Sequence, residues 1–287
     1  MFSNHRILFP VDFSKRPFAV PQAAREVIDR PNIEIVLLHV IDGGVPSASE
    51  FADRMEYLDL LARRHFSHSV VIRRLDHGRP AERILDYLHK SEIEMAVIHA
   101  RESDGFGKGS LGRVANRILA EADCPVWLEW RPARHKKLAP SAAPRICCAI
   151  DGVRQAQELI RDATIIADRL NGDLTVISSI QPGPKGAAAL FRGSETGGEE
   201  VLRETERIGK LRRRIAPWAD VRVAAGWREA VIGHAVRDLG GDLLITGDCR
   251  EAVLATEGTC PVLRLAPEPG RIAGLCGNYR GIYRSVA

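Results

Sequence analysis

The sequence predicts an α/β protein built from two tandem domains, each with a five-stranded, mainly parallel sheet covered by helices on both faces. Two observations favour this fold class. Short, nearly continuous apolar runs alternate with amphipathic segments, which is typical of strands buried on both faces and of the helices that connect them. The whole pattern also occurs twice, at a spacing of about 140 residues, which is too long for a solenoid unit and indicates a duplicated domain.

The repeat is visible in the residues themselves. The segment Arg6–Asp12 has a counterpart in Arg145–Asp151, and Asn32–Ile41 has a counterpart at the same spacing in Asn171–Ile180. A Cys-Pro-Val tripeptide stands near the end of each half. Because the order of these segments is the same in both halves, we expect the same order of strands and helices in both domains.

Each element is predicted from its residue pattern. Continuous apolar runs predict ten strands, at Ile7–Val11, Ile35–Ile41, Ser69–Leu75, Met95–His99, Val126–Trp130, Ile146–Ile150, Leu174–Ile180, Val221–Ala225, Leu243–Thr246 and Val262–Leu265. In the first half, apolar residues at helical spacing predict helices at Phe18–Ile28 and Ser49–His65. A proline at the first helical position predicts another at Pro80–Ser91, and a fourth, at Gly112–Ala122, follows a Gly-rich loop. Cys147 and Cys148 are adjacent in a strand, so we expect them to point to opposite faces as small core residues.

The domain boundaries follow from changes in composition. We expect a first domain at residues 1–130, a linker at 131–144, a second domain at 145–266 and an irregular tail at 267–287. The linker holds three prolines among charged residues, which argues against a helix or a strand. The tail is rich in proline and glycine.

Composition excludes several classes of protein. Of the 287 residues, 45% are hydrophobic and 27% charged, which is ordinary for a globular protein, and the net charge of +4 is too small to predict a nucleic-acid partner. No apolar run approaches the roughly 20 residues needed to cross a bilayer, so we expect no membrane partner. The beginning of the chain has no signal-peptide pattern and the cysteines form no Cys-x-x-Cys pair, which predicts a cytoplasmic protein with reduced thiols.

Three motifs carry a family resemblance. Ile7–Ser14 resembles the opening strand and turn of the universal stress protein family, His77–Leu85 its turn after the third strand, and Leu111–Val126 its last helix and last strand. The resemblance covers residues 5–130 and, with fewer motifs, 145–265. It implies a tandem member of that family with two Rossmann-like domains.

The resemblance also implies a nucleotide site in the first domain. Members that bind ATP place its phosphates in a loop with the pattern Gly, two residues, Gly, nine residues, Gly, then Ser or Thr. Here the spacing is kept, but His99, Glu102 and Arg113 stand at three of the four marker positions. The cofactor-binding residues that the resemblance implies are Asp12 and Val40 at the adenosine end, and Gly107, Lys108, Gly109, Gly112 and Arg113 at the phosphate end. Asp12 also fits a helix N-cap, so both interpretations stay open.

The second half lacks this loop. The connection from Gly247 to Cys260 is about twelve residues shorter than the matching one from His99 to Cys124. We therefore expect ATP or another adenine nucleotide in the first domain only.

The resulting prediction is a regulatory or stress-response protein, not an enzyme, that binds an unknown protein partner. An interaction scaffold that binds no nucleotide is the alternative. A slow ATP-hydrolysing or adenylyl-transferring enzyme has less support, since no nucleophile or general base accompanies an intact phosphate loop. The basic stretch Arg203–Arg214 is interpreted as an exposed helix face with ion pairs along the helix, not as a nucleic-acid groove.

The last strands of the two halves are expected to pair antiparallel within the chain and so to form an intramolecular pseudo-dimer. An unpaired apolar edge strand promotes aggregation, and pairing would protect both edges. The association of two chains into a homodimer is left open by the sequence.

Overall fold

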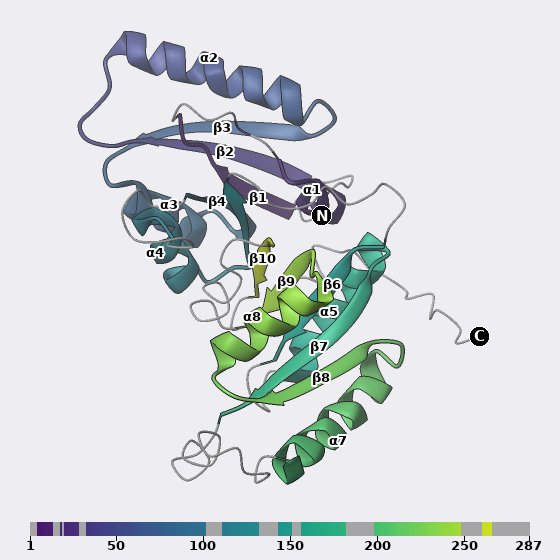
Figure 1. Cartoon of the computed structure of the whole chain (residues 1–287). Coiled ribbons are helices and arrows are strands. Elements are labelled where there is room, and N and C mark those ends of the chain that lie inside the picture. Colours follow the sequence, from purple (N-terminus) through teal and green to yellow (C-terminus); the bar gives the residue numbers. More distant parts are fainter. Residues whose placement is uncertain are drawn as a thin grey trace.

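The computed structural model describes residues 5–13, 18, 20–28, 33–101, 111–131, 143–150, 156–181, 198–247 and 260–265. These residues form one ten-stranded sheet with helices on both faces (Figure 1). The strands are β1 (His5–Pro10), β2 (Ile33–Ile41), β3 (Val70–His77), β4 (Ile93–Arg101), β5 (Val126–Arg131), β6 (Arg145–Ala149), β7 (Asp173–Ile180), β8 (Asp220–Ala225), β9 (Leu243–Thr246) and β10 (Val262–Arg264). The helices are α1 (Gln22–Ile28), α2 (Ala48–His65), α3 (Pro80–Lys90), α4 (Arg113–Glu121), α5 (Ala156–Leu170), α7 (Gly198–Ile215) and α8 (Arg228–Leu239).

The strand order confirms the predicted fold class and the duplication. The order is β3-β2-β1-β4-β5-β10-β9-β6-β7-β8, so each half has its first strand in the centre, its second and third on one side, and its fourth and fifth on the other. Within each half all neighbouring strands are parallel. We propose residues 1–130 and 145–266 as the limits of the two domains around these half-sheets.

The strands are buried on both faces, as their continuous apolar runs predict. One hydrophobic core lies under α1, α2, α5 and α7, and the other lies under α3, α4 and α8. Successive strand residues alternate between the two: Phe9 faces the first core and Leu8 the second. Cys148 and Cys147 alternate in the same way and are both buried, as predicted. Burial raises the pKa of the Cys147 thiol to about 12, so it stays protonated at neutral pH.

Three helices begin at residues other than the predicted ones, and one of them, α4, begins at Arg113, a single residue after the predicted Gly112. The structure places the start of α1 at Gln22, not at Phe18. Pro21 explains the difference, because the residue before a proline avoids the helical conformation. The start of α2 at Ala48 follows from Ser47, whose hydroxyl accepts a hydrogen bond from the backbone N–H of Glu50 at 3.2 Å while the Glu50 carboxylate accepts one from the Ser47 N–H at 3.1 Å.

The two half-sheets meet where β5 and β10 pair antiparallel, so the predicted pairing of the last strands is confirmed. Trp127 lies opposite Leu263, and neither side chain is exposed. Arg264 is also buried, and the Nη2 of its guanidinium donates to the backbone oxygens of Ala122 and Cys124 at 2.8 Å each. A charged side chain of the second half therefore donates hydrogen bonds to two backbone carbonyl oxygens of the first half.

Replacing Arg264 by methionine tests the strength of this junction. The Arg264→Met variant keeps an unbranched side chain but leaves the two carbonyl oxygens without these donors, so we expect its free energy of unfolding to fall by about 2–4 kcal/mol. Urea denaturation followed by circular dichroism measures this. The control is Arg203→Met on the exposed face of α7, which should change stability by less than about 0.5 kcal/mol. Equal effects of the two substitutions would show that the buried hydrogen bonds do not hold the halves together.

Candidate functional site

A cavity of about 750 Å³ lies in the first half, at the carboxyl ends of β1, β2 and β4 and the N-terminus of α4. The central strand β1 is flanked there by β2 on one side and β4 on the other. The strand order reverses at this point, because the chain continues from β1 to β2 and β3 on one side and then crosses to β4 and β5 on the other, and open α/β sheets bind ligands at such a point. The fold alone therefore marks this edge of the first half-sheet as the candidate site.

Four of the seven predicted site residues line this cavity. Asp12 follows β1, Val40 is the penultimate residue of β2, and Gly112 and Arg113 stand at the start of α4. The structure thus brings together residues that are far apart in the sequence. The other three, Gly107, Lys108 and Gly109, lie outside the described residues, as does Glu102.

The start of α4 offers backbone donors to the cavity. Gly112 is the N-cap, with φ −60° and ψ 151°, and it supplies no side-chain cap. Its carbonyl accepts the first helical hydrogen bond, from the Asn116 N–H at 3.0 Å. The first N–H groups of a helix have no partner within the helix, and together with the helix dipole they favour an anion. The exposed Arg113 side chain adds a positive charge at the same place.

Three side chains in contact, those of His39, Phe13 and Arg54, form one wall of the cavity. The sequence motifs did not reveal this wall. The Nδ1 of His39 donates to the backbone oxygen of Val11 at 2.8 Å. The ring of Phe13 stands edge-on to His39, with 3.8 Å between ring centroids. The guanidinium of Arg54, from α2, lies 4.8 Å from the centroid of the Phe13 ring. The only sign of this wall in the sequence is the polar His39 within the apolar run of β2. Arg54 belongs to another element, and no sequence spacing relates it to His39.

The electrostatics of this wall keep His39 neutral. The pKa of His39 is lowered to about 4: burial lowers it most, the hydrogen bond to Val11 raises it in part, and the nearby positive charge of Arg54 also lowers it. At neutral pH the wall therefore carries the charge of Arg54 and no charge on the histidine.

His99 also lines the cavity, at the first marker position of the phosphate loop. Its ring centroid is 5.9 Å from that of Phe18, which in turn lies against Phe9 at 6.1 Å. The side chain is half-buried in this aromatic cluster. Where nucleotide-binding members of the resembled family have glycine, this chain places an imidazole at the edge of the cavity.

The second half has different chemistry at the matching positions. Ser178 stands two residues before the end of β7, as His39 does in β2, and Glu204 occupies the same position in the 18-residue α7 as Arg54 in the 18-residue α2. The Glu204 carboxylate accepts hydrogen bonds from the Ser178 hydroxyl at 3.0 Å and from Arg207 Nε at 2.7 Å. A carboxylate thus replaces the cation that borders the first cavity.

Comparisons with known proteins agree with this fold. Residues 3–128 match the sequence model of the universal stress protein family. The chain is thus similar to the universal stress protein family over its first half, and its second half is not part of the match. Its length and its two half-sheets give it a tandem arrangement.

Solved structures show the same fold over nearly the whole chain. A protein of unknown function from Pseudomonas aeruginosa PAO1 is 16% identical, with a TM-score of 0.63 over 96% of each chain. A universal stress protein from Archaeoglobus fulgidus is 18% identical, with a TM-score of 0.61 over 93% of this chain and 100% of that one. A putative universal stress protein from Pseudomonas aeruginosa UCBPP-PA14 is 15% identical, with a TM-score of 0.62 over 96% and 97%. Among curated proteins no match was found.

Two features are absent from the residues that the structure describes. Those residues contain no group of three or more His, Cys, Asp or Glu side chains arranged to hold a metal ion. None of the helices that the structure describes is long and apolar enough to span a membrane.

The buried His39 predicts a pH-dependent stability. Its pKa is about 4 in the folded chain and about 6.5 in the unfolded chain, so the unfolded state binds the proton first as the pH falls. The stability that neutral His39 provides is complete above pH 6.5 and declines towards pH 4. Between pH 7.5 and pH 5 we expect a loss of about 2 kcal/mol from this group.

Urea denaturation at the two pH values measures the loss, and His39→Gln is the comparison because glutamine keeps an N–H donor without titrating. We expect the pH dependence of the variant to be smaller by that amount. The same pH dependence in both proteins would contradict the burial of a neutral histidine.

Proposed function

We propose that the first domain binds an adenine nucleotide, such as ATP, in this cavity, and that the protein is regulatory and not an enzyme. One observation carries the proposal. Asp12, Val40 and the N-terminus of α4 converge on one cavity of about 750 Å³, at the edge of the sheet where open α/β folds bind ligands. A volume of this size is within the usual range for sites that bind small molecules and cofactors.

Each residue has a role that its chemistry supports. We propose that the Asp12 carboxylate accepts hydrogen bonds from ribose hydroxyls and that Val40 contacts the adenine. At the other end, the guanidinium of Arg113 and the first N–H groups of α4 would hold phosphate oxygens. Gly107, Lys108 and Gly109 are proposed to complete the phosphate end, on the strength of the sequence. His39 donates its Nδ1–H to Val11, and its low pKa of about 4 makes it a weak base at neutral pH, which supports binding over general-base catalysis in this wall.

The proposal is restricted to the first domain. The matching wall of the second domain has the Glu204 carboxylate, paired with Arg207, where the first has Arg54, so the cation that Arg54 offers to a triphosphate has no counterpart at that position. The chain from Gly247 to Cys260 is also too short for a phosphate loop of the family's length. We further propose a cytoplasmic location, a protein partner of unknown identity and the single chain as a pseudo-dimer.

A scaffold that binds no nucleotide is the second candidate, and His99 favours it. This side chain stands where the family's pattern has the first glycine of the phosphate loop, and it limits how closely a phosphate can approach the backbone. In that case the first domain keeps the fold and presents its surface to a partner.

Calorimetry with ATP distinguishes the two candidates. We expect measurable binding by the unmodified protein, and a loss of about 1–3 kcal/mol of binding free energy in each of Arg113→Ala and Lys108→Ala, because each removes a charge-assisted contact with phosphate. The matched control is Arg117→Ala, which removes the same charge from the same helix but from a side chain paired with Glu121 and Glu82 outside the cavity. This control should bind ATP as the unmodified protein does.

Absence of heat with millimolar ATP would support the scaffold. Equal losses in Arg113→Ala and Arg117→Ala would show that net charge, and not the proposed site, determines the affinity.

A further inference from the structure

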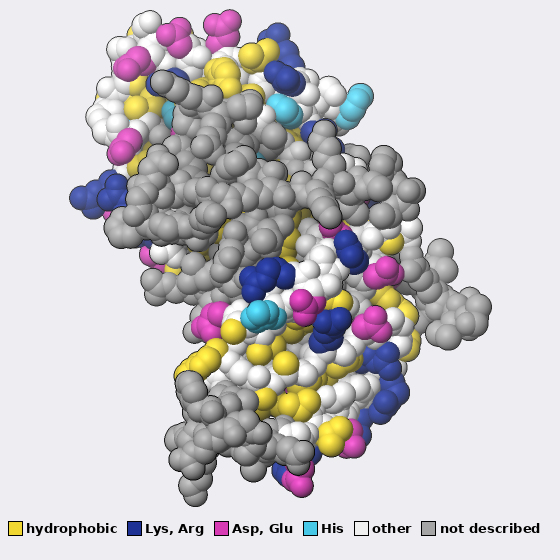
Figure 2. Space-filling model, viewed as in Figure 1, with side chains coloured by type: hydrophobic (Ala, Val, Ile, Leu, Met, Phe, Trp, Pro, Cys, Tyr) yellow, Lys and Arg dark blue, Asp and Glu magenta, His cyan; other side chains and the backbone are white. Residues whose placement is uncertain are grey.

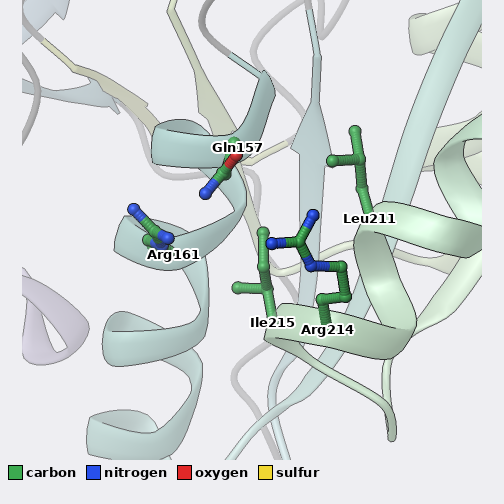
Figure 3. A pocket seen from close by; sticks show the side chains of 5 residues that line it. All are labelled: Gln157, Arg161, Leu211, Arg214 and Ile215. Atoms are coloured by element: carbon green, nitrogen blue, oxygen red, sulfur yellow. The ribbon is translucent and has the colours of Figure 1, made fainter.

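A second cavity, of about 320 Å³, lies between α5 and α7 in the second half of the chain (Figure 3). It is on the face of the sheet covered by α1, α2, α5 and α7, away from the carboxyl edge where the candidate nucleotide site lies. Five described residues line it: Gln157, Arg161, Leu211, Arg214 and Ile215.

Helical spacing places these side chains on two facing surfaces. Gln157 and Arg161 are four residues apart on α5, so they share one face. Leu211 stands three and four residues before Arg214 and Ile215 on α7, so these three also share a face. Figure 3 shows the guanidinium of Arg214 directed from the end of α7 towards α5, from which Gln157 and Arg161 project.

Two other arginines, both on α7, have partners within the protein. Arg203 pairs with Glu199 at 3.0 Å, and Arg212 donates to the backbone oxygens of Pro217 and Ala219. Within the part of the chain that the structure describes, Arg161 and Arg214 take part in no salt bridge, and none of the described lining residues is acidic. The last turn of α7 is basic, and Figure 2 shows Lys and Arg side chains gathered over this end of the helix.

We propose that this cavity is a binding site for a phosphate group, either inorganic phosphate or a small phosphate monoester. Two guanidinium groups present forked N–H donors that match the oxygens of a phosphate, and the Gln157 amide adds a neutral donor. A phosphate carries a charge of about −1.5 to −2 at pH 7. Two arginines therefore match the charge of a phosphate better than they match the single negative charge of a carboxylate. The small volume and the apolar side chains of Leu211 and Ile215 favour a compact ligand over a nucleotide.

Calorimetry with two probes, inorganic phosphate and glycerol phosphate, tests the proposal on the full-length chain. We expect Arg161→Gln and Arg214→Gln each to weaken binding by about tenfold or more, because each removes one forked contact. Both side chains are exposed, so these substitutions should leave the melting temperature close to that of the unmodified protein.

Two controls locate the bound phosphate. Arg213→Gln removes the same charge from the same turn of α7 but outside the cavity, and Arg113→Gln removes the cation of the first-domain site. Both should bind the probes within about twofold of the unmodified protein. Tighter binding of glycerol phosphate than of inorganic phosphate would assign the site to an ester, and the reverse would assign it to the free anion.

Three outcomes would overturn the proposal. They are absence of heat with both probes, loss of binding in Arg113→Gln with no change in Arg161→Gln and Arg214→Gln, and an equal loss in Arg213→Gln. In each case Arg161 and Arg214 would be solvated side chains whose stems cover Leu211 and Ile215.

Discussion

The antiparallel pairing of β5 with β10 is the contact on which the rest of the structure depends. Each half-sheet would otherwise end in a short apolar edge strand, and such edges pair with other chains. Here the two edges protect each other, with Trp127 and Leu263 fully buried at the join. The antiparallel pairing has a second consequence. The strands of the two half-sheets run in opposite directions, so their carboxyl ends lie at opposite ends of the continuous sheet. A ligand at the carboxyl ends of one half-sheet therefore has no direct contact with the carboxyl ends of the other.

The two halves share a fold but differ where ligands would bind. Burial of both sheet faces determines the strand order, and the alternation of apolar side chains is the same in both halves. The strand ends and connections are under a different constraint, and there the chain has His39 and Arg54 on one side but Ser178 and Glu204 on the other. The two halves thus have the same fold but different chemistry at the matching positions.

The sequence predicted much of this fold because burial leaves a local pattern. The strands, the junction and the alternate faces of Cys147 and Cys148 all follow from continuous apolar runs. Asp12, Val40, Gly112 and Arg113 could be named through the family resemblance, and the structure places them around one cavity, while their role in binding stays a prediction. The contact of Arg54 with Phe13 and the place of Arg161 and Arg214 around one cavity could not be predicted, since each depends on how a helix packs against a distant element.

The central claim is one nucleotide site per chain, in the first domain, and a crystal structure of the protein grown with ATP tests it most directly. The account predicts one nucleotide per chain, with its adenosine end at Asp12 and Val40 and its phosphates at Arg113 and the start of α4. Nucleotide in the second half-sheet, or an empty first cavity at a millimolar concentration of ATP, would contradict it.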